Sequence, residues 1–202
     1  MQVNILGTTY EMEKTEGFMD AFEWQINQAL EENGLYLNHL VIDGTPVADD
    51  YESYITEHFD RIQYIEVRAD TLADMLENAL HSGRDYLERA LPEIRKLGRA
   101  FHHQPDSTTW AKFEQMMEGL DWVLLMMRSM AANADTLAGG EEYGYLALLL
   151  GTKLAYLTSA VTRRDPVSSG DLIVYEIMPL LESVARRVDQ TICDPGPLRT
   201  TG

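Results

Sequence analysis

Histidines are the first candidate metal ligands to consider, because the chain has only five of them. Glu77 and His81 are four residues apart, a spacing that places two ligands on one face of a helix. His102 and His103 follow near the far end of the same helical pattern, about 30 Å from His81 at the helical rise per residue. These four residues are the candidates for a metal site. The alternative is that they are polar residues near the ends of a helix, where imidazolium complements the helix dipole.

Motifs for covalent catalysis and cofactor binding are missing from the sequence. It has no Gly-x-Ser-x-Gly nucleophile motif, no P-loop and no Gly-x-Gly-x-x-Gly dinucleotide motif. The single cysteine, Cys193, falls in a Pro/Gly/Thr-rich tail and has no disulfide partner within the chain. We therefore predict no catalytic residues, no cofactor and no enzyme activity.

Carboxylates and tyrosines gather between residues 49 and 54. Asp49, Asp50, Tyr51, Glu52 and Tyr54 combine negative charge with aromatic rings, which are enriched in protein interfaces. Such a cluster attracts a partner of positive charge. We predict that these residues bind a basic protein. The alternative is a solvated face that only aids solubility.

Methionine and tryptophan side chains mark a second candidate surface. Met116, Trp122, Met126 and Met130 accompany the apolar stripe of the helical pattern that follows residue 107. Methionine is flexible and polarizable, so it suits surfaces that adapt to a partner. We predict that this face binds an apolar helical segment or a second copy of the chain. The alternative is a wide core face in a crowded helical bundle.

The elements that must position these residues change in type near residue 68. Before it, short strand patterns flank one amphipathic helix, and Asn33-Gly34 and Asp43-Gly44 supply a helix stop and a hairpin turn. The expected order is strand, strand, helix, strand, short strand, helical turn, strand. The expected strands are 2–6, 8–12, 35–42, 45–47 and 62–67.

This order resembles the β-grasp layout of ubiquitin-like domains. The resemblance covers residues 1–68 and is carried by the opening MQVNI, the turn at IDGTPV and the closing IQYIEV. It implies a small α/β domain with a sheet face of the kind that binds other proteins. No diglycine tail follows Val67, so the resemblance does not imply conjugation chemistry.

After residue 68 the apolar residues recur every three or four positions in four successive stretches. Breaks at Gln104-Pro105, Gly139-Gly140 and Asp165-Pro166 separate them, which predicts an antiparallel four-helix bundle over residues 69–192. Pro92 and Pro179 fall inside helical patterns, where we expect kinks. Residues 193–202 are expected to form a flexible tail. The predicted fold class is α+β, a small β-grasp-like domain followed by this bundle.

Charge narrows the classes of partner. The net charge is −17, and the first 68 residues hold 14 acidic but only three basic residues. Nucleic-acid binding needs clustered Lys and Arg, and anionic membranes repel an acidic chain, so we expect neither. The longest apolar run, Tyr143 to Leu150, is shorter than a membrane span. With one cysteine and no apolar leader, we expect a cytoplasmic protein.

These observations together predict a non-catalytic protein-interaction module of adaptor or chaperone type. An acidic domain would recognise a basic protein, and the bundle would form a homodimer or hold an apolar helical segment. Two alternatives stay open: a bundle that binds a small molecule or metal ion, and a purely structural homo-oligomer.

Overall fold

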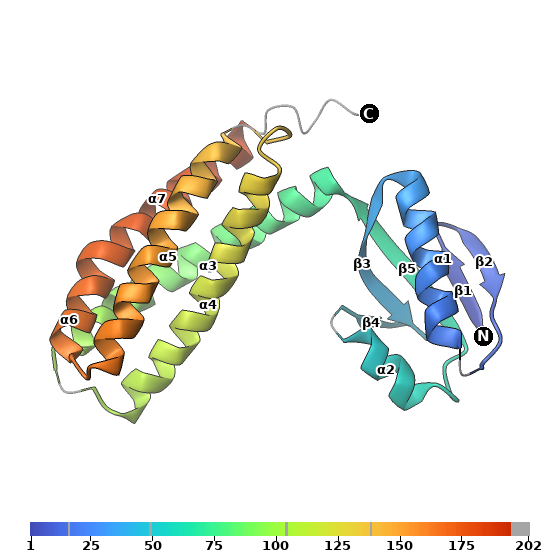
Figure 1. Cartoon of the computed structure of the whole chain (residues 1–202), viewed down its shortest axis with the longest axis horizontal. Helices are drawn as coiled ribbons and strands as arrows, with labels where there is room; N and C mark the ends of the chain where they lie inside the picture. The colour runs from blue at the N-terminus through green and yellow to red at the C-terminus, as the bar shows by residue number, and fades with distance from the viewer. Residues whose placement is uncertain (16, 49, 104, 138, 195–202) are drawn as a thin grey trace. The chain divides into compact units, whose positions relative to one another are not determined.

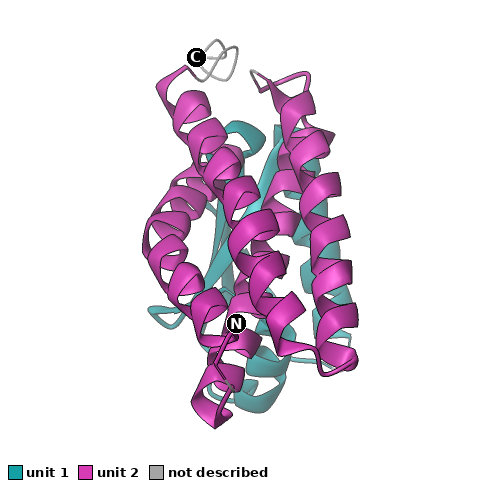
Figure 2. Cartoon of the chain, turned by 90° about the vertical axis from the view of Figure 1, so that its left-hand side faces the viewer, with its two compact units in different colours: residues 1–75 teal, residues 76–202 magenta. Residues whose placement is uncertain are grey.

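The chain divides into two compact units, Met1–Met75 and Leu76–Gly202 (Figure 2). The structure is a computed structural model that describes residues 1–194 except 16, 49, 104 and 138. The first unit extends past the expected boundary at residue 68, because its last strand continues to Thr71 and pairs there with Leu35. The units are an α+β sheet domain and a set of helices, as the predicted fold class requires.

The first unit is a five-stranded mixed sheet with the strand order β2-β1-β5-β3-β4. The central pair β1 and β5 is parallel, and the other three pairings are antiparallel. This is the β-grasp arrangement that the sequence resemblance implied. The strands are β1 Gln2–Ile5, β2 Thr8–Glu11, β3 Leu35–Ile42, β4 Thr45–Val47 and β5 Tyr64–Thr71.

Helix α1 (Phe18–Asn33) covers one face of this sheet (Figure 1). Phe18, Phe22, Ile26 and Leu30 repeat every four residues, and all four are buried. Gly34 ends the helix with a φ of 62°, a left-handed conformation that glycine adopts at little cost. The strands contribute alternate residues to the same core, and the short helix α2 (Tyr51–His58) adds Ile55.

Two tight turns set the register of the sheet. Leu6-Gly7 joins β1 to β2 and Asp43-Gly44 joins β3 to β4, and all four residues have positive φ. Positive φ at both central residues is the type I′ geometry, which matches the twist of a hairpin. The Asp43 carboxylate also accepts the backbone N–H of Tyr64 at 2.8 Å, which ties the hairpin to the start of β5.

The second unit is an antiparallel four-helix arrangement, as predicted. Its first three helices are α3 (Leu72–Ala100), which begins within the first unit, α4 (Ser107–Ala132) and α5 (Gly140–Thr162). The fourth is a continuous rod made of α6 (Pro166–Asp171), the π-helical segment η1 (Leu172–Ile177) and α7 (Met178–Cys193). Cys193 is therefore the exposed last residue of a helix, not part of a tail. The rest of the expected tail, 195–202, lies outside the described residues.

Aspartates begin two of these helices. The Asp106 carboxylate accepts the backbone N–H of Thr109 at 2.8 Å, and the Asp165 carboxylate accepts that of Ser168 at 3.0 Å. Each bond satisfies a donor that the first helical turn leaves unpaired. Hydrogen bonds to Thr109 and Ser168 lower the pKa of these two carboxyl groups.

The two prolines inside helical patterns are accommodated differently. Helix α3 continues through Pro92 without a break. Pro179 is the second residue after η1, whose wider π turn accommodates a residue that has no N–H to donate and would crowd the preceding turn. The sequence predicted a kink at Pro179 and did not reveal this widened turn.

Candidate functional site

The predicted acidic cluster is brought together at the start of α2. Asp50 precedes the helix with a φ of 48°, and Tyr51, Glu52 and Tyr54 follow on it, while Asp49 lies outside the described residues. Burial and the carboxylates of Glu23 and Glu52 raise the pKa of the Tyr51 hydroxyl.

The tyrosine rings of this cluster are partly used for packing. Tyr51 and Tyr54 pack against the buried core of the sheet unit. Tyr54 also stacks on His58, with the ring centroids 4.5 Å apart. The cluster therefore offers a partner its carboxylates more than its rings.

The methionines predicted to face a partner lie inside the bundle. Met116, Met126 and Met130 are buried in the bundle, so they do not form the exposed face that the prediction requires. The apolar arc of α4 is wide because the helix lies between α3 and α5 (Figure 1), and Met126 fills the space above Gly83 of α3. Trp122 is 39% exposed and packs edge-on against Tyr86 of α3. The structure corrects the prediction for the three methionines and leaves Trp122 at the surface.

The candidate metal ligands are not gathered into one site. Glu77 and His81 form a pair with 3.9 Å between Oε1 and Nε2. His102 lies beyond the end of α3 and pairs with Asp171 at 3.5 Å, and His103 is exposed beside it. Among the residues that the structure describes, no three His, Cys, Asp or Glu side chains come close enough to hold a metal ion.

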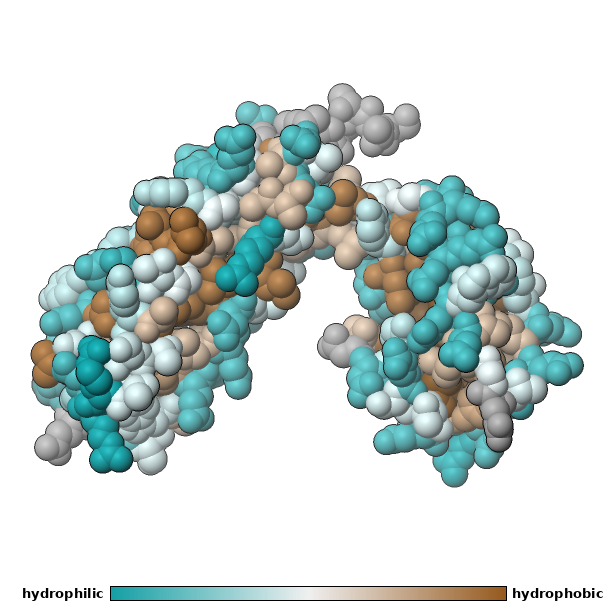
Figure 3. Space-filling model, in the orientation of Figure 1, coloured by the Kyte–Doolittle hydropathy of each residue, from teal (hydrophilic) through white to brown (hydrophobic). Residues whose placement is uncertain are grey.

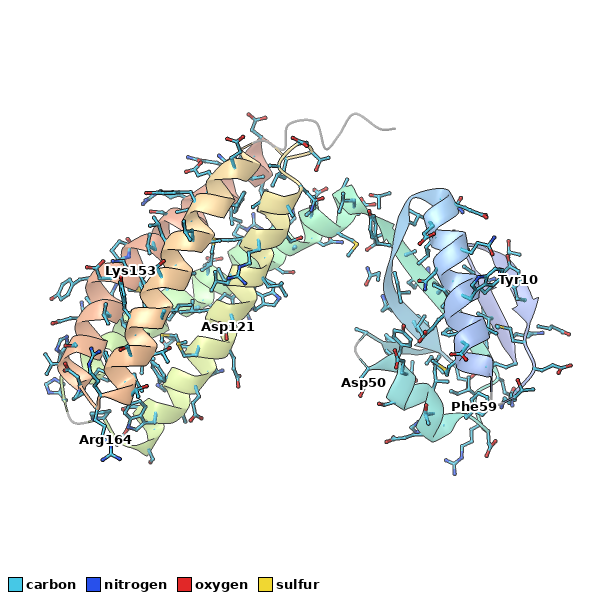
Figure 4. All side chains as sticks on the ribbon, in the orientation of Figure 1. Tyr10, Asp50, Phe59, Asp121, Lys153 and Arg164 are labelled. Atoms are coloured by element: carbon cyan, nitrogen blue, oxygen red, sulfur yellow. The ribbon has the colours of Figure 1, made fainter. Side chains whose placement is uncertain are left out.

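A further surface, which no sequence motif marks, lies between β2 and α1. A groove of about 340 Å³ separates the strand from the helix, and Tyr10 is labelled beside it in Figure 4. Its lining combines apolar side chains with two carboxylates: Tyr10, Met12, Phe18, Ala21, Gln25, Thr15, Glu11 and Glu13. The neighbouring Lys14 donates to the Asp60 carbonyl at 2.8 Å, which directs its charge toward Phe59 and α2.

The strand that borders this groove has a free edge. Met1 and Met12 exchange two backbone hydrogen bonds of 2.9 Å, so they form a hydrogen-bonded pair of the β1–β2 ladder. Hydrogen-bonded and non-hydrogen-bonded pairs alternate along an antiparallel ladder. The N–H and C=O groups of Thr9 and Glu11 therefore point away from β1, toward the outside of the sheet.

The opposite edge of the sheet is protected by a proline. In β4, Thr45 pairs with Ile42 next to the two-residue turn, and Pro46 pairs with Val41. By the same alternation Pro46 holds the outward position, where it has no N–H to offer. Edges without such protection readily accept a further strand. One edge of this sheet is thus blocked and the other is open.

The helical unit has a groove of its own between α3 and α4. Its volume is about 330 Å³, and its floor is formed by Ile94, Leu97 and Met116. Arg89 and Lys112 stand at its rim beside Tyr86, Ala90, Glu93 and Gln115. The groove combines an apolar floor with cations, although the chain as a whole is strongly acidic.

Helix α5 is the most apolar helix of this unit. Among the described helices it is the one long and apolar enough to cross a membrane by length and composition, although the apolar run Tyr143 to Leu150 within it is shorter than a membrane span. One such helix is weak support for a membrane span, because core helices of bundles pass the same test. Only 33% of its most apolar window is buried within the structure.

The comparisons with known proteins place the chain in a family through its helices. The fold and the grooves define an α+β protein with a β-grasp-like unit and a four-helix unit. Residues 78–187, more than half of the chain, match the family described as Domain of unknown function (DUF8042), and the chain belongs to it. The match lies within the helical unit and leaves the sheet unit outside. No curated protein and no solved structure matches the chain.

Proposed function

We propose that this chain is a non-catalytic protein-interaction module whose sheet unit binds a basic, extended segment of a partner protein along β2. The observation that carries the proposal is the open edge of β2 beside a groove with apolar walls and two carboxylates. Strand addition at such an edge is a common mode of peptide recognition. On the side of this chain, such binding would use its backbone groups and side chains alone, without a cofactor.

Backbone hydrogen bonds between β2 and the added strand would supply affinity, and the groove would select among partner sequences by their side chains. The outward groups of Thr9 and Glu11 are two donors and two acceptors for an added strand. Side chains of an added strand alternate between the two faces of the sheet. Those on the α1 side would enter the groove beside Phe18 and Met12, and the groove lining also includes Glu11 and Glu13.

Charge supports a basic partner. The unit Met1–Met75 carries 16 acidic and three basic residues. A field of one sign speeds the encounter with an oppositely charged partner and suppresses other partners. Salt screens such attraction, with a Debye length of about 8 Å at physiological ionic strength.

The direct test is binding of a synthetic peptide with alternating apolar and basic residues, acetyl-KVKIRVK-amide, measured by fluorescence anisotropy. We expect binding that weakens from 50 to 500 mM NaCl by about tenfold or more. Thr9→Pro removes an outward N–H without touching the β1 pairing, so it should abolish binding, whereas Thr9→Ala should preserve it.

Charge reversals separate the two acidic clusters. If the β2 edge is the site, Glu11→Lys should weaken peptide binding by roughly tenfold. Asp50→Lys with Glu52→Lys at α2 should have a smaller effect, because the peptide would not contact them. If only the α2 double variant weakens peptide binding, the docking site is the acidic cluster of residues 49–54 and not the β2 edge. An affinity that stays unchanged in Thr9→Pro and in both charge-reversal variants would contradict the proposal.

We further propose that the interaction takes place in the cytoplasm, where a lone exposed cysteine stays reduced. Fractionation of cells that express a tagged full-length chain measures this directly. Recovery of the chain outside the cytoplasmic fraction would contradict it.

A second candidate function rests on the α3–α4 groove, whose volume suits a small ligand with an apolar body and an acidic group. Arg89 and Lys112 would pair with the acid, and Ile94, Leu97 and Met116 would contact the apolar body. The probe is 1-anilinonaphthalene-8-sulfonate, whose fluorescence should rise on binding. Ala90→Phe should fill the groove and remove the signal, and an unchanged signal would exclude this site.

A further inference from the structure

Helix α5 carries two apolar stripes, and only one faces its own unit. Tyr143, Ala147, Leu150, Leu154 and Leu157 are buried against the other helices. On the opposite side, Tyr145, Leu148 and Tyr156 are 62%, 68% and 57% exposed. Figure 3 shows that hydrophobic residues reach the surface of the helical unit at several places. No other described helix of this unit covers this second stripe.

The second stripe has a palindromic spacing. Its successive positions are separated by 4, 3, 4, 4, 3 and 4 residues: Glu141, Tyr145, Leu148, Thr152, Tyr156, Ser159 and Arg163. Steps of three and four keep side chains on one face of a helix. Because the pattern is symmetric about Thr152, two antiparallel copies of this helix would place each position opposite its mirror position.

The charges of the stripe follow the same symmetry. In such a pair Leu148 faces Tyr156 of the other copy, and Glu141 at one end faces Arg163 at the other. Between these ends the stripe itself has no Lys, Arg, Asp or Glu, and Lys153 lies at its border. It is paired with Glu176 at 2.8 Å and lies over the Tyr156 ring (Figure 4). The stripe therefore carries no formal charge between its ends, and its two ends are complementary to each other in an antiparallel pair.

We propose that α5 is the contact surface for a second copy of this chain, related by a twofold axis at Thr152 with the two α5 helices antiparallel. A twofold contact of this kind uses the same surface on both copies. The helical unit favours such a contact because Leu76–Gly202 holds 17 acidic and 13 basic residues and is nearly neutral for its size. Two sheet units would repel each other far more strongly.

The available area is enough for a reversible dimer. An aromatic side chain offers about 150–250 Å², so the exposed parts of the stripe would bury roughly 1,000 Å² over two copies, at the lower bound of specific interfaces. We therefore expect a concentration-dependent dimer of micromolar affinity and not an obligate one.

Analytical ultracentrifugation of the full chain between about 5 and 200 μM tests this, with a reductant present so that Cys193 forms no disulfide between copies. We expect the mass to rise toward that of two chains. Leu148→Glu with Tyr156→Glu buries like charges at facing positions and should leave a monomer. Leu125→Glu, at a leucine of α4 that is 66% exposed and off the stripe, is the matched control and should still dimerise.

A charge exchange tests the antiparallel geometry. Glu141→Arg alone and Arg163→Glu alone each replace two attractive contacts by two repulsive ones and should weaken dimerisation roughly tenfold. The double exchange restores attraction and should recover most of the affinity. The proposal would be overturned if the wild type stays a monomer at 200 μM, or if the variant with Leu148→Glu and Tyr156→Glu still dimerises. It would also be overturned if the double charge exchange does not recover the affinity of dimerisation. If the chain is a monomer and floats with phosphatidylcholine vesicles, and if the variant with Leu148→Glu and Tyr156→Glu does not float, the stripe binds a lipid surface instead.

Discussion

The sheet unit and the helical unit differ most in charge. Met1–Met75 carries 16 acidic and three basic residues, whereas Leu76–Gly202 carries 17 and 13. The first can attract a basic partner over a distance, and the second can approach a copy of itself without strong repulsion. The difference in charge therefore suits the sheet unit to binding a basic partner and the helical unit to binding a second copy of the chain.

The units also differ in what holds them together. The sheet depends on pairings between distant residues, such as Leu35 with Thr71, and on the turns Leu6-Gly7 and Asp43-Gly44. The helices depend on local hydrogen bonds and on stripes that pack against one another. A substitution should therefore act mainly within the unit that contains it.

The largest expected effect is that of Phe22→Ala in the sheet unit. Phe22 is buried and stacks on Phe18 at 5.4 Å, so its removal leaves a cavity and should cost about 3–5 kcal/mol. Hydrogen exchange should show lost protection in β1, β3 and β5 with little change in α4 and α5. Trp24→Ala, at an exposed residue of the same helix, should change the stability by less than about 0.5 kcal/mol. Equal loss of protection in both units would show that they unfold as one.

A smaller effect is expected at a close helix crossing in the helical unit. A Cβ at Gly98 would lie 2.7 Å from Val174 Cγ2 and 2.8 Å from Ile173 Cγ2. Gly98→Ala should therefore cost about 1–2 kcal/mol of net stability, despite the higher helix propensity of alanine. Gly151→Ala, where the nearest atom is 3.9 Å away, should be neutral or stabilising in the same urea titration. If both variants behave alike, the α3 crossing is looser than the structure shows.

Tyr143→Phe removes a single buried hydrogen bond. The Tyr143 hydroxyl lies 2.9 Å from Thr191 Oγ1 and links α5 to α7. Its loss should cost about 1 kcal/mol by urea unfolding. Tyr145→Phe, at an exposed hydroxyl two residues away, should cost nothing measurable.

Tyr143 also gives the helical unit a dependence on alkaline pH. Burial raises the pKa of its hydroxyl. The stability that follows from this shift is present below the ordinary tyrosine pKa and is lost as the pH rises through the folded-state value. Tyr143→Phe should flatten that alkaline dependence.

The smallest effect is expected from acid acting on the helix caps. Because hydrogen bonds lower the pKa of Asp106 and Asp165 in the folded chain, their contribution is present above the ordinary carboxyl pKa. It is lost as the pH falls through the folded-state value. Asp106→Asn keeps a capping oxygen that does not titrate, so its thermal midpoint should fall less than that of the wild type between pH 5 and pH 3, followed by circular dichroism.

Much of the fold could be predicted because it is encoded locally. The four-residue spacing of Phe18 to Leu30 identified α1, and Asn33-Gly34 and Asp43-Gly44 marked a helix end and a hairpin turn. The four helical stripes and the breaks between them correspond to four rods, because each stripe must face the others to be buried.

The candidate surfaces were harder to predict. Met116, Met126 and Met130 have the composition of an adaptable surface, but a helix with neighbours on two sides buries a wider arc than one stripe suggests. The β2 edge carries no motif of its own. The alternation of side chains along the strand predicts that Tyr10 and Met12 face the core. It does not predict a groove, because the groove exists only where α1 passes the edge strand β2.

The sequence by itself determined the segregation of charge, the turns, the helix caps and the two stripes of α5, because each depends on residues close together in the chain. Only the tertiary structure decided that β2 and not β4 presents an open edge, because strand order follows from the pairing of β1 with β5 across some 60 residues of chain. It also decided which α5 stripe is buried, because that depends on the helices packed around it. Local chemistry specified the elements, and long-range packing selected the surfaces that remain for partners.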